Sequence, residues 1–166
     1  MSANFYLCLG GNQGDKAQLF SDAIAEIENR VGELVEASSI YETEAWGFEA
    51  DELFWNQVVV VRSSAEPHLV LKTVLEIEKD LGRVRKGKGY ASRPMDIDIL
   101  FIDDEQINTA DLIVPHPLLQ ERRFVLEPLA EIAATKVHPV LKKEIEILLQ
   151  ECADSCKVVK KTTETK

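Results

Sequence analysis

The sequence is short of the features that mark secreted and membrane-spanning chains. Its three cysteines, Cys8, Cys152 and Cys156, include no Cys-x-x-Cys pair, which argues against a disulfide framework or a zinc site. No apolar run approaches the roughly 18–20 residues of a membrane span. The first apolar run, residues 5–9, is not preceded by the basic residues of a signal peptide. We therefore expect a cytoplasmic protein with no membrane partner.

Positive charge is also scarce, and much of it is concentrated in one segment. The chain has 19 Lys and Arg against 29 Asp and Glu, a net charge of −10, which predicts general repulsion of nucleic acid. Residues 83–93 nevertheless hold Arg83, Arg85, Lys86, Lys88 and Arg93, with no acid among them. An acidic protein with one basic segment is expected to bind a compact anion there.

The composition that is present is that of one globular domain. Apolar residues make up 45% and charged residues 29% of the 166 positions, which excludes a disordered or fibrous chain. A chain of this length buries roughly two-thirds of its unfolded surface, so its core needs no metal or disulfide. We predict a single domain over residues 1–156 and a frayed polar tail at 157–166.

Hydrophobic periodicity predicts the order of elements in this domain. Strands are predicted at residues 5–9, 34–43, 54–62 and 95–102, with helices between Asp15 and Gly32 and between Pro67 and Gly82. A hairpin or excursion is expected at 105–115 and helices at 124–133 and 142–152, with Cys152 and Cys156 as neighbours at the end of the last. The order β-α-β-β-α-β predicts a ferredoxin-like α+β fold, with an antiparallel sheet and additional C-terminal helices. A doubly wound parallel fold is disfavoured because no helix separates the second and third strands.

Two glycine-rich segments resemble phosphate-binding loops without their full pattern. Residues 82–89 follow a helix and end in glycine, where a P-loop follows a strand and needs Ser or Thr. Residues 10–14 lack the G-x-G-x-x-G spacing. The second segment is either a tight strand-to-helix turn or a place where a ligand approaches the backbone.

The pair Asp96 and Asp98 is the most specific chemical feature. Residues i and i+2 of a strand point to one face with Cα atoms ~7 Å apart. Magnesium is commonly held by one or two carboxylates together with substrate phosphates. The alternative is the solvent face of an ordinary strand. Arg93 and the basic segment before it favour phosphate chemistry, since they place cations for phosphate beside carboxylates for a metal.

Two further groups allow either a functional or a structural interpretation. His116, between two prolines, is either a packed residue or a ligand contact. Asn56 follows Phe54 and Trp55, an aromatic and amide group that suits a flat heterocycle but is also typical of a core. We find no Ser/His/Asp or Cys/His grouping that would indicate a covalent mechanism.

Taken together, seven motifs follow the order found in one enzyme family. They are LGGN (residues 9–12), YET (41–43), FWN (54–56), GRVR (82–85), RPMDID (93–98), VPHP (114–117) and RRFVLEPL (122–129). With them the chain resembles the 6-hydroxymethyl-7,8-dihydropterin pyrophosphokinases from about residue 5 to residue 133.

The resemblance implies an activity and a set of site residues. The β,γ-pyrophosphoryl unit of ATP would pass to the hydroxymethyl oxygen of the reduced pterin, releasing AMP, in folate biosynthesis. Asp96 and Asp98 would hold two magnesium ions, while Arg83 and Arg93 would bind the polyphosphate and stabilise its charge. The other nucleotide contacts implied are Glu78, Arg85, Lys88, Ile99, His116 and Arg122. The pterin contacts implied are Gly10, Thr43, Glu44, Trp46, Phe54, Asn56 and Phe124, with the two phenylalanines on either side of the ring.

The family pattern also implies two lids, at residues 44–53 and 83–94. Gly11 stands where serine is common, and Gly89 where some members have arginine, so Lys88 is the nearest substitute cation. Asp111 and Ile113 replace nucleotide contacts, and no role is transferred to them. A catalytically silent binding module of the same fold is the main alternative, and an RNA-binding module is disfavoured by the charge. We expect a monomer.

Overall fold

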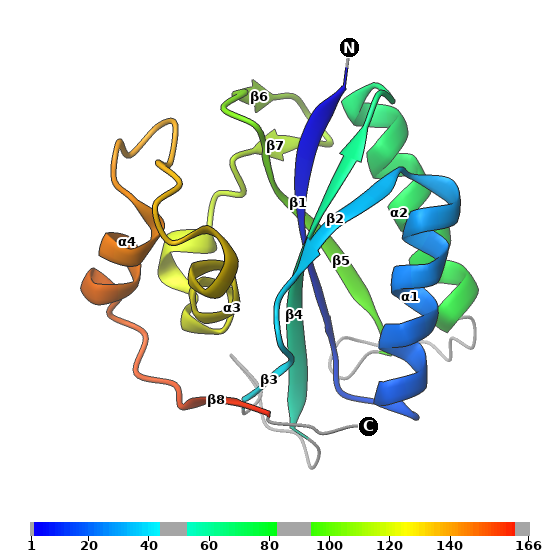
Figure 1. The fold of residues 1–166 in the computed structure, drawn as a ribbon, viewed down its shortest axis with the longest axis horizontal. Coiled ribbons are helices and arrows are strands. Elements are labelled where there is room, and N and C mark those ends of the chain that lie inside the picture. The colour runs from blue at the N-terminus through cyan, green and yellow to red at the C-terminus, as the bar shows by residue number, and fades with distance from the viewer. Residues whose placement is uncertain (1, 44–52, 83–93, 162–166) are drawn as a thin grey trace.

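The computed structural model describes residues 2–43, 53–82 and 94–161 (Figure 1). An antiparallel sheet runs in the order β5-β1-β4-β3-β8, and β2 also pairs with β4. Its strands are β1 (Ala3–Gly11), β2 (Glu33–Ala37), β3 (Tyr41–Thr43), β4 (Phe54–Ser63), β5 (Asp96–Ile102) and β8 (Val158–Lys160). The helices are α1 (Lys16–Arg30), α2 (Pro67–Gly82), α3 (Arg123–Ala133) and α4 (Ile145–Glu151), with a 3-10 turn at Leu119–Glu121. The predicted ferredoxin-like α+β fold is confirmed.

Helices cover both faces of this sheet. On one face, α1 and α2 enclose a core that includes Phe5, Phe20 and Val74. On the other, α3 and α4 enclose a second core that includes Leu126 and Leu148 (Figure 1). The additional C-terminal helices predicted from the sequence therefore form the second layer. None of the helices in the described part of the chain is long and apolar enough to cross a membrane.

The first helix begins and ends at the residues that the sequence predicts. The carboxylate of Asp15 accepts a hydrogen bond from the Gln18 N–H at 3.2 Å, which satisfies one free donor of the first turn. At the other end a Cβ on Gly32 would overlap the carbonyl oxygen of Arg62. Glycine is required there because the chain passes directly against β4.

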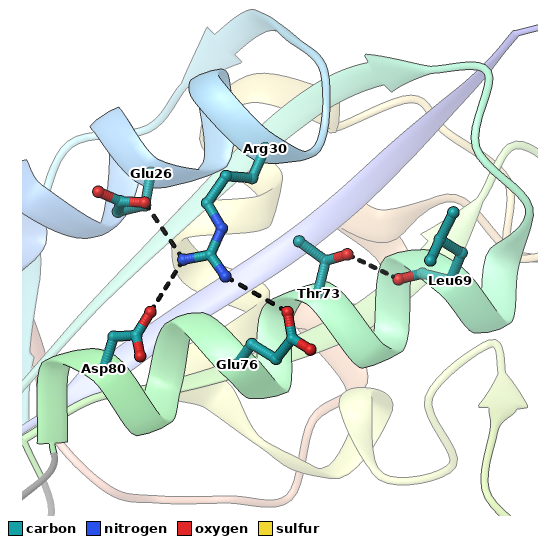
Figure 2. A network of polar contacts seen from close by, with 6 residues as sticks. All are labelled: Glu26, Arg30, Leu69, Thr73, Glu76 and Asp80. Carbon is teal, nitrogen blue, oxygen red and sulfur yellow. Dashed lines mark hydrogen bonds and ion pairs between the residues drawn. The ribbon is translucent and has the colours of Figure 1, made fainter.

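One arginine joins the two helices on this face (Figure 2). The Arg30 guanidinium contacts Glu26 at 3.3 Å on its own helix, and Glu76 at 3.4 Å and Asp80 at 3.0 Å on α2. Hydrogen bonds to Asp80 and Glu26 raise the pKa of Arg30. The cluster is exposed, so it contributes mainly to the relative orientation of α1 and α2 and little to stability.

The strand predicted at residues 34–43 is divided into β2 and β3. At the break, the Ser38 hydroxyl accepts a hydrogen bond from the Val58 N–H at 3.0 Å, and the Ser38 carbonyl accepts one from the Gln57 amide at 2.8 Å. The next residue, Ser39, binds the carboxylate of Glu131 on α3. Ser38 keeps one backbone bond to β4, from its N–H to the Val58 carbonyl at 2.8 Å, and the added side-chain bonds direct the chain toward α3.

The hairpin predicted at residues 105–115 is confirmed as β6 (Ile107–Asn108) paired with β7 (Ile113–Val114). Two predictions nearer the C-terminus are wrong. Cys152 directly follows α4 and Cys156 lies beyond it in extended chain, so the two cysteines do not share a helix. Residues 158–160 are not a frayed tail but strand β8, because their backbone pairs with β3.

Candidate active site

Asp96 and Asp98 lie on β5, and the residues that alternate with them show where they point. Ile97 and Ile99 are 3% and 5% exposed and pack in the core beneath α1 and α2. The aspartates therefore face the α3 side of the sheet, where Asp96 is half-buried and Asp98 exposed. Across the sheet, Asp96 is paired with Gly10. The prediction that the two aspartates share one face is confirmed.

Strands β3 and β4 add polar and aromatic residues to the same face. The register pairs Gly10 with Asn56 and Thr43 with Phe54. Asn56 and Phe54 lie on the face of β4 that carries Val58, which packs under α3. Asn56 is 3% exposed, and its Nδ2 has no hydrogen-bond partner in the described part of the chain. A buried unpaired donor is costly, so a ligand acceptor is its expected partner.

The opposite wall of the site comes from the segment that leads into α3. Arg122 precedes this helix and Phe124 lies in its first turn. The guanidinium carbon of Arg122 is 5.7 Å from the centroid of the Phe124 ring, a cation–π contact that fixes both side chains. The candidate site residues thus come from strands β1, β4 and β5 and from the start of α3.

The buried thiol of Cys8 reports the electrostatics of this space. Burial and the carboxylates of Asp98 and Asp96 raise its pKa, while the charge of Arg122 lowers it. The thiol therefore stays protonated, and Cys8 is no nucleophile. Arg122 and the two aspartates therefore all lie close enough to Cys8, on β1, for their charges to change its pKa.

His116 is held by its own main chain and stays uncharged. Its ring Nδ1 accepts a hydrogen bond from the Leu118 N–H at 3.1 Å, and its main-chain N–H donates to the Leu100 carbonyl at 3.0 Å. Burial, with a smaller contribution from Arg122, lowers the pKa of His116 to about 4. At pH 7 the ring is neutral with its proton on Nε2, so it can offer one N–H donor but no positive charge.

Lowering the pH from 7 to 5 is expected to reduce the free energy of unfolding through His116. Its folded-state pKa of about 4 lies below the ordinary 6.5, so between these values the unfolded chain binds more protons and is favoured as pH falls. The stabilisation is complete above pH 6.5 and is lost as the pH falls toward 4. Urea denaturation at both pH values should show a loss about 1 kcal/mol smaller in His116→Gln. Equal losses in the two proteins would contradict the assignment.

Glu78 and Ile99 contribute from the outer edge of β5. The Glu78 carboxylate on α2 accepts a hydrogen bond from the Ile97 N–H at 2.6 Å, between the two aspartates in the sequence. This contact fixes the strand edge that carries the carboxylate pair. The Ile99 side chain lies in the core. Any contact of Ile99 with a ligand would therefore use its main chain.

Six of the predicted site residues lie outside the described part of the chain: Arg83, Arg85, Lys88, Arg93, Glu44 and Trp46. The described part includes no group of three or more His, Cys, Asp or Glu that could hold a metal. The pair Asp96 and Asp98 still fits magnesium, which takes one or two carboxylates and completes its shell with phosphate and water.

The partners of Thr43 were not predicted from the sequence. Its hydroxyl donates to the Lys157 carbonyl at 3.0 Å and lies 3.0 Å from the sulfur of Cys156, both in the C-terminal segment. The adjacent β-branched residues Val158 and Val159 were the feature that could have indicated a strand here.

A comparison with protein-family models matches residues 6–134 to 7,8-dihydro-6-hydroxymethylpterin-pyrophosphokinase (HPPK). The chain belongs to this pyrophosphokinase family. Members of the HPPK family are diphosphotransferases of folate biosynthesis, and the family indicated by the sequence motifs is confirmed.

Curated HPPK relatives match over most of this chain. A 2-amino-4-hydroxy-6-hydroxymethyldihydropteridine pyrophosphokinase of Porphyromonas gingivalis is 42% identical over 137 residues, which cover 81% of this chain and 92% of that protein. The Aquifex aeolicus enzyme of the same name is 39% identical over 144 residues, which cover 87% of this chain and 89% of that protein. The folic acid synthesis protein fol1 of Pneumocystis carinii is 36% identical over 90% of this chain, which spans only 20% of that longer protein.

Solved structures agree with the HPPK fold. The structure titled HPPK-DHPS in complex with substrates superposes with a TM-score of 0.72 at 18% identity, and a Plasmodium falciparum HPPK-DHPS with 0.73 at 16%. Each match covers 91% of this chain but 43% of the other, so the chain spans less than half of those proteins. At these identities the likeness shows the fold alone.

Proposed function

We propose that this chain transfers the β,γ-pyrophosphoryl unit of ATP to the hydroxymethyl oxygen of 6-hydroxymethyl-7,8-dihydropterin, releasing AMP. The observation that carries the proposal is the shared face of the sheet. It brings the carboxylates of Asp96 and Asp98 beside the unpaired Asn56 amide, opposite Arg122 and Phe124. In this proposal a metal and phosphate subsite lies next to the place where the flat polar ring binds. In the same proposal the protein acts as a cytoplasmic monomer.

The pterin is proposed to bind between the sheet and α3. The Nδ2 of Asn56 is aimed at no described protein acceptor, so it is the donor for a ring nitrogen or carbonyl. Phe54, from β4, and Phe124, from α3, supply aromatic faces for the two sides of the ring. Thr43, paired with Phe54, and Gly10, paired with Asn56, complete the floor, and Glu44 and Trp46 are proposed contacts from the adjoining segment.

The polyphosphate is proposed to bind at the aspartate end of the site. Two magnesium ions held by Asp96 and Asp98 would neutralise phosphate charge there. Arg83 and Arg93 are proposed to bind the moving phosphoryl groups. The remaining proposed nucleotide contacts are Glu78, Arg85, Lys88, Ile99, His116 and Arg122. The neutral His116 would act as an N–H donor, consistent with its lowered pKa.

Positioning and charge stabilisation carry the proposed catalysis. Attack on the β-phosphorus requires the hydroxymethyl oxygen to lie in line with the leaving AMP oxygen. Strands β1, β4 and β5 would hold the pterin so that its hydroxymethyl oxygen lies on that line. No described side chain is assigned as the general base.

Gly10→Ala is expected to weaken pterin binding without changing the KM for ATP. A Cβ at this position would lie 2.9 Å from Oδ1 of Asn56, so the amide must move. A displaced donor loses its aligned hydrogen bond, and we expect the KM for pterin to rise roughly tenfold. Steady-state kinetics with each substrate varied in turn measures the effect. An unchanged KM for pterin would contradict this arrangement of Gly10 and Asn56.

Phosphorus NMR of the protein with ATP, magnesium and 6-hydroxymethyl-7,8-dihydropterin tests the proposed reaction. AMP and a pterin diphosphate should appear together, and only when the pterin is present. Formation of ADP would indicate an ordinary kinase and overturn the proposal. An unchanged spectrum from a folded sample would favour the silent binding module.

A further inference from the structure

The segment after α4, residues 152–160, crosses from one wall of the proposed pterin slot to the other. We call it the C-terminal strap. In Figure 1 it leaves α4, passes below α3 and joins the sheet as β8 beside β3. It lies beyond residue 134, where the family match ends.

At the α3 wall, the strap is attached through one aspartate. The Asp154 carboxylate accepts the N–H of Arg123, the first residue of α3, at 3.0 Å, and the Cys156 N–H at 2.9 Å. The Asp154 carbonyl accepts Nε of Arg123 at 2.8 Å, and the Cys152 carbonyl accepts its Nη2 at 3.2 Å. The residue before the helix, Arg122, makes no side-chain cap, so Asp154 supplies the negative group that a helix N-terminus favours.

At the sheet wall, the strap is attached through Thr43. The backbone of β8 pairs with β3, Val158 lying opposite Thr43. The Thr43 hydroxyl donates to the Lys157 carbonyl, and Thr43 is 3% exposed. The next position across the sheet is Phe54. The strap therefore joins the strand position beside Phe54 to the residue beside Phe124.

We infer that the C-terminal strap sets the separation of the two aromatic walls, with Asp154 as a positioning residue for pterin binding. The inference rests on the proposed function, because it takes Phe54 and Phe124 as the two sides of the pterin slot. With the strap attached, the slot is preorganised, and no binding free energy is spent on ordering the start of α3.

A second attachment of α3 to the sheet supplies the control. Glu131 accepts hydrogen bonds from Ser39 and from the Tyr41 hydroxyl, at 2.9–3.0 Å. It lies eight residues after Arg123, about 12 Å along the helix. Glu131 also lies 3.7 Å from Nζ of Lys160 in β8. Both acids connect α3 to the sheet, but only Asp154 is bound to the residue next to Phe124.

The test compares Asp154→Ala with Glu131→Ala in the full chain. Both variants should lower the Tm. In Asp154→Ala we expect the KM for pterin to rise roughly tenfold while the KM for ATP stays within about twofold. In Glu131→Ala both KM values should stay within about twofold of the wild type. Direct titration of pterin fluorescence gives the same comparison without turnover.

Equal changes in the pterin KM of the two variants would overturn the inference, since the strap would then act only through stability. An unchanged pterin KM in Asp154→Ala would overturn it as well. If that variant does not fold, Arg123→Met cuts the guanidinium contacts to the strap and takes its place with the same expected split. Failure of the proposed function is distinguishable, because the wild-type protein would then release no AMP.

Discussion

Asp98→Asn is expected to lower kcat by at least about 10³-fold while leaving the fold intact, and Asp96→Asn to behave in the same way. The carboxylates share the side of an edge strand that faces α3, and the alternating isoleucines hold that strand in the core on the other side. Asparagine preserves side-chain size but removes the negative charge that magnesium and its phosphates require. The loss should therefore appear in catalysis and in the dependence on magnesium.

Three measurements separate this result from a general effect. The first is kcat as a function of magnesium concentration for the wild type and both variants, and the second is the Tm of each protein, which should shift by only a few degrees. The third is the activity of the matched variant Asp104→Asn, which should equal that of the wild type. Asp104 is an exposed aspartate, 3.4 Å from Nζ of Lys136. Near-normal turnover in Asp96→Asn or Asp98→Asn would remove that residue from the metal site.

Asn56→Ala is expected to reduce kcat/KM for the pterin roughly 10- to 100-fold. In the proposed complex the Asn56 amide is a buried donor paired only with the substrate, so its removal leaves a substrate acceptor unsatisfied in a dry slot. The free protein gains nothing from this donor, whose Nδ2 has no partner among the described residues. Stability should therefore change little, or rise slightly.

Steady-state kinetics and thermal denaturation together test this expectation. The KM for ATP should stay within about twofold of the wild type, since the amide lies at the pterin end. Asn108→Ala, at an exposed position on β6, removes the same group far from the site and should have no effect. An equal loss of kcat/KM for ATP and for pterin would show that Asn56 stabilises the sheet and does not bind the substrate.

The sequence was sufficient to predict the orientation of residues whose side chains alternate between the two faces of a strand. Asp96 and Asp98 alternate with isoleucines that must be buried, so their common face followed from the strand period alone. Asn56 could be placed in a strand by the same reasoning, but the room for its side chain depends on Gly10 of the neighbouring strand. Which strands are neighbours is a property of the topology and is not visible in either segment.

The predictions that failed concern contacts between distant parts of the chain. The break at Ser38 is made by bonds to Gln57 and Val58, some twenty residues further on. The first N–H of α3 is bound by Asp154, 31 residues after Arg123. Strand β8 has only three residues, of which Val158 and Val159 favour a strand, and it forms because the edge of β3 is available to it.

Strand β8 also protects the sheet against other chains. An uncovered edge strand presents free N–H and C=O groups, which are a template for pairing with another molecule and hence for aggregation. Here the outer edge of β3 is occupied by the chain's own Val158–Lys160, and Lys160 adds charge at that boundary. The edge strand on this side is therefore the three-residue β8, whose shortness and lysine disfavour edge-to-edge association.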